Sequence, residues 1–313
     1  MRHASPHTAP HTAPRPRRRA PGVKGAPALF AIATLIWGST WLAITFQLGV
    51  VASEYSVAYR FALAALLLAL WCRASGRSLS FSRRDHAFLA LQGVLMFGVN
   101  YIAIYEAERY LTSGLVAVLF STAVFMNPIG MKLAFGAALG SRTMLAATLG
   151  VAGVVLLFLP ELATVRQSAT VGLGIAFGLA GTALSTGGSL IAVRNHRANV
   201  GVLAGTAWGM AWGALTAVLV AVATGVPWSF DARPAYWLSL AYLALFGSVV
   251  AFAAYFTLIR KAGVAVAGYT GVATPVIAVL LSTLFEGFAW TPTAALGVAL
   301  AIAGNAIALK PGR

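Results

Sequence analysis

The chain has 313 residues, of which 59% are hydrophobic and only 9% are charged. Soluble domains carry about 25% charged residues, so this composition excludes a soluble domain and indicates a protein whose solvent is lipid. The net charge of +15 would suggest nucleic-acid binding in a soluble protein. Here the basic residues lie in a terminal segment and in short loops, and they form no compact basic domain, so we expect no nucleic-acid partner.

The amino-terminal segment and the cysteine content set two further limits. Residues 1–27 are rich in Pro, Ala, His and Arg and lack hydrophobic periodicity, which predicts a disordered basic tail. Arg17, Arg18 and Arg19 resemble a twin-arginine signal, but no cleavage-type stretch follows them, so we expect a retained tail. The lone Cys72 excludes an intrachain disulfide and a cysteine metal cluster. The sequence predicts neither a metal site nor a cofactor.

The rest of the chain alternates long apolar runs with short charged breaks. A membrane-spanning helix needs about 20 mostly apolar residues, and the runs lack the period-two alternation of a β-barrel. The sequence therefore predicts an all-α integral membrane protein with ten transmembrane helices. Their expected starts lie near Ala28, Ser56, Ala87, Tyr110, Thr143, Val171, Gly201, Ala235, Val264 and Thr293.

The loop charges predict the orientation. With the amino terminus in the cytoplasm, 18 of the 22 Lys and Arg residues fall on the cytoplasmic side and three fall outside. The acidic residues show the opposite bias, since Asp85 alone is inside. Such an excess of cytoplasmic basic residues is the usual topology signal of bacterial membrane proteins. We therefore expect a multi-pass protein of the inner (plasma) membrane with both termini cytoplasmic.

The ten helices divide into two sets of five, over residues 28–160 and 171–311. A separation of 151 residues aligns Gly153 with Gly304 and Val124 with Pro275. Because five is odd, the second set must enter the membrane from the opposite side, and the aligned Arg109 and Arg260 are indeed expected on opposite sides. Inverted repeats are a recurrent transporter architecture with the substrate near the midplane. This predicts two inverted five-helix repeats.

Several stretches resemble the ten-helix EamA type of the drug/metabolite transporter superfamily. They are Leu35–Ile44 with its Trp-Gly-Ser, Tyr59–Leu63 with its Arg-Phe, Tyr242–Gly247, Ala273–Ile277 and Leu284–Gly287. The resemblance covers nearly everything after residue 27. It implies a fold of two EamA domains and a transport activity.

The resemblance also implies a central substrate cavity between helices of both repeats. Polar and aromatic residues on those helices are the candidates for the substrate pathway, and packing is the competing interpretation of each. They are Trp37, Ser39, Asn100, Tyr101, Thr122, Asn127, Ser185, Thr186, Tyr255, Tyr269 and Thr274. We expect them to surround a polar-aromatic pocket near the bilayer centre.

Four further residues are candidates for a structural or gating role. Pro128 and Pro275 interrupt helices, because proline has no N–H to donate, and Glu286 closes the ninth expected helix. Arg60 is the one strong charge within a span, which makes it a functional candidate that needs a partner. The candidate partners are Glu54, Glu106 and Glu108.

From these features we expect a secondary transporter that moves a small-molecule substrate across the lipid bilayer by alternating access. The expected activity is export of amino acids or related metabolites, with a multidrug exporter or an uptake carrier as the alternatives. An intramembrane transferase is the distant rival. All seven acidic residues lie near helix ends, so we expect no enzyme.

A glycine every four residues from Gly201 to Gly213 predicts close helix packing or a homodimer contact.

Overall fold

The computed structural model describes residues 25–162 and 168–309, and within these ranges every regular element is helical. The first half contains α1 (Ala26–Thr45), α2 (Ser53–Ala74), α3 (Arg83–Gly93), η1 (Val94–Val99), α4 (Asn100–Glu108), α5 (Ser113–Ser121), α6 (Ala123–Phe135) and α7 (Ser141–Leu162). The second half contains α8 (Ser168–Arg197), α9 (Val202–Ala223), α10 (Pro234–Tyr242), η2 (Leu243–Val250), α11 (Ala251–Ala262), α12 (Val264–Gly268), α13 (Thr270–Phe285) and α14 (Pro292–Leu309). The expected tail lies almost wholly outside the described residues.

Consecutive elements join into long apolar helices. In the described part of the chain, nine helices are long and apolar enough to cross a membrane, and a tenth apolar helix over Pro292–Ile307 is shorter. Four of the nine combine several elements: Arg83–Glu108, Ser113–Phe135, Pro234–Ala262 and Val266–Phe285. The all-helical fold predicted from the apolar runs is confirmed over these residues. The observed helices begin within a few residues of the expected starts.

Local sequence explains where helices begin and end. The Ser82 hydroxyl accepts the Asp85 N–H at 3.1 Å and so caps the first turn of α3. At the end of α6, Gly136 adopts φ 69° and its N–H donates to the Lys132 carbonyl at 2.9 Å. A left-handed residue at this position favours glycine because it lacks a Cβ. These caps fix where the charged loops leave the helices.

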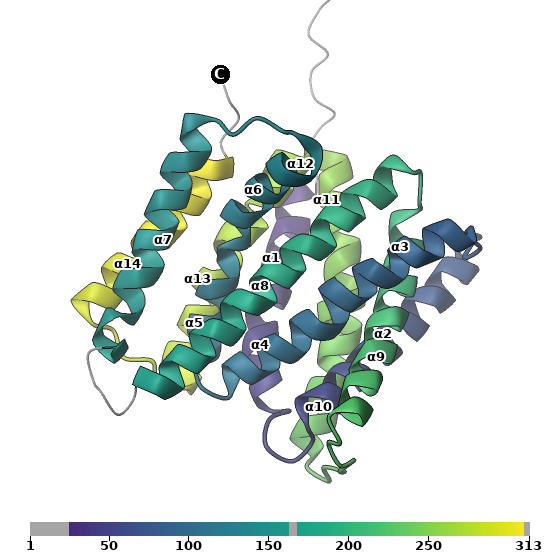
Figure 1. Cartoon of the computed structure of the whole chain (residues 1–313), viewed down its shortest axis with the longest axis horizontal. Helices are drawn as coiled ribbons and strands as arrows, with labels where there is room; N and C mark the ends of the chain where they lie inside the picture. Colours follow the sequence, from purple (N-terminus) through teal and green to yellow (C-terminus); the bar gives the residue numbers. More distant parts are fainter. Residues whose placement is uncertain (1–24, 163–167, 310–313) are drawn as a thin grey trace, which may run out of the picture.

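The helices form a single bundle in which the two halves are interleaved (Figure 1). At one side α7 packs along α14, and at the other α2 packs along α9. Between them, α1 from the first half contacts α11 and α13, whereas α8 from the second half contacts α4, α5 and α6. Each half therefore completes its packing with helices of the other, and the main hydrophobic core contains residues of both halves.

Two helices of the bundle contain a π-helical segment. The segment η1 lies within the span Arg83–Glu108, and η2 lies within the span Pro234–Ala262. Pro128 lies inside α6 and Pro275 inside α13. Wide turns of this kind and internal prolines disturb the regular backbone hydrogen bonds of a helix. Both halves are thus interrupted in their third and fourth long helices.

The glycine face of α9 packs within the chain. A Cβ added to Gly213 would lie 2.9 Å from the Phe97 carbonyl carbon, and one added to Gly209 would lie 3.2 Å from the Phe97 ring. The glycines therefore let α9 approach η1 closely. The glycine face thus serves close packing of helices within the chain, which is one of its two expected roles. The other, a homodimer contact, stays a prediction.

Contacts between helix ends and loops fall into two groups at the two ends of the bundle. At one end, Arg194 in the last turn of α8 pairs with Asp85 in the first turn of α3 at 3.1 Å. At the other end, Ser53 donates to Glu106 at 2.6 Å and Ser229 donates to the Val50 carbonyl at 2.7 Å. Each of these contacts joins segments that the charge pattern assigns to the same side of the membrane.

Candidate functional site

The expected pathway residues lie on the helices through which the halves are interleaved. Trp37 and Ser39 are on α1, Asn100 and Tyr101 on α4, and Ser185 and Thr186 on α8. Thr122 lies between α5 and α6, Asn127 within α6, Tyr255 on α11, Tyr269 between α12 and α13, and Thr274 on α13. The set therefore draws on both halves of the bundle.

Trp37 is the centre of an aromatic cluster that joins α1 to α11. Its ring centroid lies 5.1 Å from that of Tyr255 and 5.3 Å from that of Phe252. The Trp37 Nε1–H donates to the Gly247 carbonyl at 3.1 Å, an acceptor in the π-helical segment η2. Edge-to-face packing together with this hydrogen bond fixes the indole plane.

Ser39 makes a second connection between the halves. Its hydroxyl lies 2.7 Å from the Tyr242 hydroxyl at the end of α10 and also donates to the Leu35 carbonyl at 2.7 Å. One turn of α1 thus contacts the middle of η2 through Trp37 and the residue directly before η2 through Ser39. The two candidates on α1 are held by partners on the second half of the chain.

Small residues bring α1 and α13 into close contact beside this cluster. A Cβ added to Gly38 would lie 3.3 Å from the Thr274 carbonyl oxygen. On the opposite side of the bundle, a Cβ added to Gly188 would lie 3.1 Å from the Met96 backbone, so α8 approaches η1 in a similar way. The backbones of the central helices are therefore close to each other near both sets of pathway residues.

Several buried polar atoms in this region have no hydrogen-bond partner in the described chain. The atoms on pathway residues are Asn100 Oδ1, Asn127 Oδ1, Thr186 Oγ1 and Thr274 Oγ1. Buried polar atoms are normally paired, because an unpaired one loses its hydration without compensation. By contrast, the Thr122 hydroxyl donates to the Leu119 carbonyl at 2.7 Å. These four atoms lie on α4, α6, α8 and α13, and their hydrogen-bonding capacity is unused within the described chain.

A buried charged group adjoins Tyr101. The Arg60 side chain is only 3% exposed, and its guanidinium lies 4.7 Å above the Tyr101 ring and 5.2 Å from the Phe61 ring centre. Its Nε and Nη1 atoms have no hydrogen-bond partner among the described residues. Arg60 forms none of the ion pairs expected with Glu54, Glu106 or Glu108, since Glu106 binds Arg109 and Ser53 instead. A cation–π contact takes the place of a salt bridge.

The burial of Glu108 was not expected from the sequence. This carboxylate is 6% exposed, neither of its oxygens has a partner in the described chain, and Arg60 and Glu286 lie within electrostatic range. Nearby, the buried Tyr105 hydroxyl donates to Gln47 Oε1 at 2.7 Å. A helix-end glutamate is usually exposed, so only the packing of α4 against its neighbours reveals the burial.

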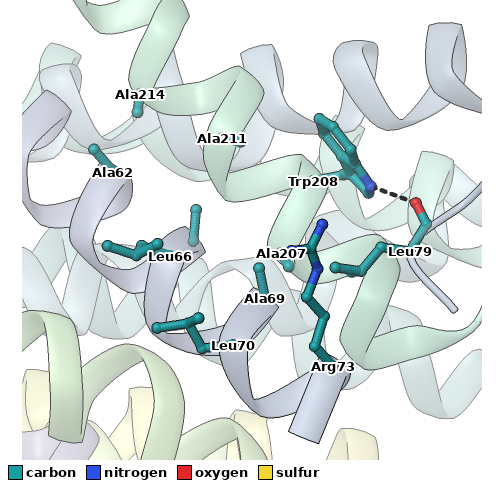
Figure 2. A pocket seen from close by; sticks show the side chains of 11 residues that line it. Ala62, Leu66, Ala69, Leu70, Arg73, Leu79, Ala207, Trp208, Ala211 and Ala214 are labelled. Carbon is teal, nitrogen blue, oxygen red and sulfur yellow. Dashed lines mark hydrogen bonds between the residues drawn. The ribbon is translucent and has the colours of Figure 1, made fainter. Parts of the chain in front are cut away.

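Two cavities in the bundle lie away from the expected pathway. One of about 520 Å³ lies between α2 and α9 and is lined mainly by alanine and leucine (Figure 2). The other, of about 280 Å³, lies among the loops after α1 and α9 and includes Arg109. None of the pathway residues lines either cavity. Among the described residues, no cluster of three His, Cys, Asp or Glu side chains could hold a metal ion.

Comparisons with known proteins agree with this architecture. A solved crystal structure of a protein superposes with a TM-score of 0.65 at 18% identity, covering 91% of this chain and 96% of the other. Protein PagO of Salmonella typhimurium (strain LT2) is 28% identical over 95 residues, which are 30% of this chain and 31% of PagO. The match therefore spans less than a third of that relative.

The EamA-like transporter family model matches the chain twice, over residues 25–159 and 172–309. The two matches together cover most of the chain, and they coincide with the two halves that are interleaved in the bundle. A protein of this family with these apolar helices is a multi-pass membrane protein that takes part in transmembrane transport. The chain belongs to the EamA-like transporter family of the drug/metabolite transporter superfamily.

Proposed function

We propose that the protein is a secondary transporter that carries a small metabolite across the inner membrane by alternating access between two inverted five-helix repeats. The observation that carries this proposal is the reciprocal packing of the halves. α1 packs on α13 and α11, and α8 packs on α5, α6 and α4, the elements at the corresponding positions of the other half. Two similar halves that exchange conformations provide two states of similar energy.

The contact between α7 and α14 supports the inverted relation in detail. A Cβ added to Gly153 would meet Gly297 and Ala301, whereas one added to Gly304 would meet Ala146 and Gly150. A separation of 151 residues relates each member of the first contact to a member of the second. Because later residues of α7 face earlier residues of α14, the two helices are antiparallel. A two-fold axis perpendicular to both helices accounts for this exchange, and for membrane-spanning helices such an axis lies in the membrane plane.

The loop contacts support ten spans with both termini in the cytoplasm. Asp85 pairs with Arg194 at one end of the bundle, and Gly25 lies near the Lys261 ammonium at that same expected side. Arg109, which the charge pattern places outside, lines the cavity formed by the loops after α1 and α9. If the chain crosses the membrane ten times, with α14 as the tenth crossing, all of these segments lie on the sides that the charge pattern predicts.

The chemistry of the candidate pathway favours an amino acid or a related zwitterionic metabolite. Trp37 and Tyr255 provide an aromatic wall, and the unpaired oxygens of Asn100 and Asn127 are free to accept hydrogen bonds from a solute. Buried groups of opposite charge, Arg60 and Glu108, adjoin the same region. Export is the expected direction. A multidrug exporter and an uptake carrier remain the alternatives within transport.

A binding screen followed by a transport assay tests the proposal. Purified protein is first screened by thermal shift against amino acids, nucleosides and sugars, and the stabilising compounds are then assayed by counterflow in proteoliposomes. We expect an amino acid or related metabolite to raise the melting temperature and to exchange across the vesicle membrane. Saturable binding without any exchange would overturn the transporter assignment. Product formation from a bound lipid-linked substrate would favour the rival, an intramembrane transferase.

A further inference from the structure

The cavity between α2 and α9 is formed by small side chains on both helices. Ala62, Ala65 and Ala69 follow each other at helical spacing on α2, and Ala207, Ala211 and Ala214 do so on α9. Residues three and four apart share one face of a helix. The two alanine faces leave a groove of about 520 Å³ between helices that pack along each other (Figure 2).

This groove opens toward the lipid-facing surface of the bundle. Leu66 and Leu70, which line it, are 56% and 54% exposed and lie within the membrane-spanning helix Ser53–Ala74. Exposed leucines inside a span are the normal lipid-facing surface of a membrane helix. An alkyl chain from the bilayer therefore reaches the groove directly, and its burial there needs no polar partner.

One end of the groove is polar and positively charged. Arg73 lies in the last turn of α2 and lines this end, where the Trp208 Nε1–H donates to the Leu79 carbonyl at 2.9 Å (Figure 2). Arg73 takes part in none of the ion pairs found in the described part of the chain, and Asp85 after it is engaged by Arg194. The exposed guanidinium is thus available to an anionic group at the same end as the apolar groove.

We propose that the groove between α2 and α9 is a binding site for an anionic phospholipid, with one acyl chain between the alanine faces and the phosphate on Arg73. Charge complementarity selects this occupant, because a guanidinium binds phosphate through two parallel hydrogen bonds. Tryptophan at the level of the headgroups is typical of such an interface. Basic pockets between helices on the cytoplasmic side bind anionic headgroups in other membrane proteins. The assignment of this site to the cytoplasmic leaflet rests on the membrane orientation given in the proposed function. The existence of the site does not depend on that orientation.

Native mass spectrometry of the full-length protein in detergent tests the site with phosphatidylglycerol and phosphatidylcholine of identical acyl chains. We expect discrete one-to-one binding with preference for phosphatidylglycerol, and Arg73→Gln to weaken its binding by about fivefold, the contribution of one Arg at an anionic surface. Arg77→Gln is the matched control, because it removes the same charge from the loop directly after α2 without lining the groove. Ala211→Phe fills the groove and should weaken both lipids, whereas Leu219→Phe, on the exposed face of α9, should not.

Ala62→Phe replaces Ala211→Phe if the latter does not fold, because Ala62 is an exposed lining residue. Equal binding of the two lipids, or equal losses in Arg73→Gln and Arg77→Gln, would overturn the proposal. A dimer that excludes the lipid would assign the groove to a second copy of the chain and would also overturn it. The measurement requires neither transport nor a known orientation. A failed transport assay with intact lipid binding would therefore reject the proposed function alone.

Discussion

Ser113 donates two hydrogen bonds to the carboxylate of Glu286: its backbone N–H lies 3.1 Å from Oε1 and its hydroxyl 2.5 Å from Oε2. Ser113 is the first residue of α5 in the first half, and Glu286 directly follows α13 in the second. The negative charge therefore meets the positive end of the α5 dipole. This contact ties the starting turn of one interrupted helix to the end of another.

The first prediction follows from this contact. Glu286→Gln keeps the shape but removes the charge, and we expect it to lower the apparent melting temperature in detergent. The expected loss is about 1.5 to 3 kcal/mol, as for a hydrogen bond to a charged group. Ser113→Ala should cost less because the backbone N–H remains. The loss of stability in the double variant should then exceed that of Glu286→Gln by no more than a few tenths of a kcal/mol. Fully additive losses would show that the two residues act separately.

The second prediction concerns the charge of Arg60. Arg60→Met removes the desolvated cation–π contact with Tyr101, which contributes about 2 kcal/mol. It also removes a positive charge within electrostatic range of the buried Glu108, so we expect the total loss of stability to exceed that of the contact alone. Glu108→Gln in the same chain should restore the electrostatic part of this loss, because the buried acid is then replaced by a neutral amide. Thermal unfolding of the single and double variants measures the coupling. Arg73→Met, an exposed arginine of the same helix, is the control. An additive double variant would contradict an electrostatic link between Arg60 and Glu108.

The sequence predicts the helices well because lipid demands long apolar runs, and the observed starts at Ala26 and Val264 lie close to the expected positions. It does not predict η1 and η2, since the widened turns contain the same apolar residue types as regular membrane helices. The partner of Arg60 was also not predictable. The choice between Glu106 and the Tyr101 ring depends on side-chain directions along α4, and Glu106 is engaged by Arg109 and Ser53.

The candidate pathway was predictable only as a set of helices. Polar residues inside spans identify α1, α8 and α13, but the pattern cannot show which hydroxyl bonds its own helix. Thr122 does so, whereas Thr186 and Thr274 retain an unpaired oxygen. The sequence does not indicate the groove between α2 and α9, because alanine is common throughout the chain and its spacing on these helices is not distinctive.

The third prediction concerns the aromatic wall. Trp37→Phe keeps a ring beside Tyr255 but loses the Nε1–H donated to the Gly247 carbonyl. If Trp37 lines the pathway, we expect the KM for counterflow of the identified substrate to rise by about tenfold, the effect of one hydrogen bond and part of a ring contact. Trp41→Phe is the matched control, since the Trp41 ring packs on Phe120 instead. Equal effects of the two substitutions would favour a packing role for Trp37.

The fourth prediction concerns pH. Arg233 donates to both carboxylate oxygens of Asp231, with Nη2 at 2.6 Å from Oδ2, and these hydrogen bonds hold the pKa of Asp231 below its ordinary value. A carboxyl group with a lowered pKa stabilises the folded state above its unfolded pKa, about 3.9. That stabilisation disappears as the pH falls through the lower folded value.

Thermal unfolding of the parent protein and of Asp231→Asn across pH measures this contribution. We expect a constant difference at neutral pH that closes once the pH falls below about 4. The same comparison in an Arg233→Gln background is the control, because the guanidinium that lowers the pKa is then missing. A difference that persists unchanged at low pH would show that the Asp231 side chain acts through packing and not through its charge.

The last prediction concerns the symmetry of the two halves. Gly153 and Gly304 occupy reciprocal places in the contact between α7 and α14, where an added Cβ would lie 2.6 Å from the Ala301 nitrogen and 2.7 Å from the Ala146 oxygen, respectively. Because backbone atoms cannot yield as a flexible side chain does, Gly153→Val and Gly304→Val should each destabilise the protein. The expected cost is about 1 to 3 kcal/mol, as for overpacking a tight interface.

Gly172→Val is the matched control, because a Cβ at Gly172 would meet no atom within 4 Å. Thermal unfolding in detergent should give similar losses for the two reciprocal variants and none for the control. If the halves exchange roles during transport, both variants should also slow counterflow, since α7 and α14 then keep their contact in both conformations. A large loss at one glycine and none at the other would mean that the shared 151-residue frame does not describe equivalent positions. The principal structural support for alternating access would then be lost, even though membership of the transporter family would stand.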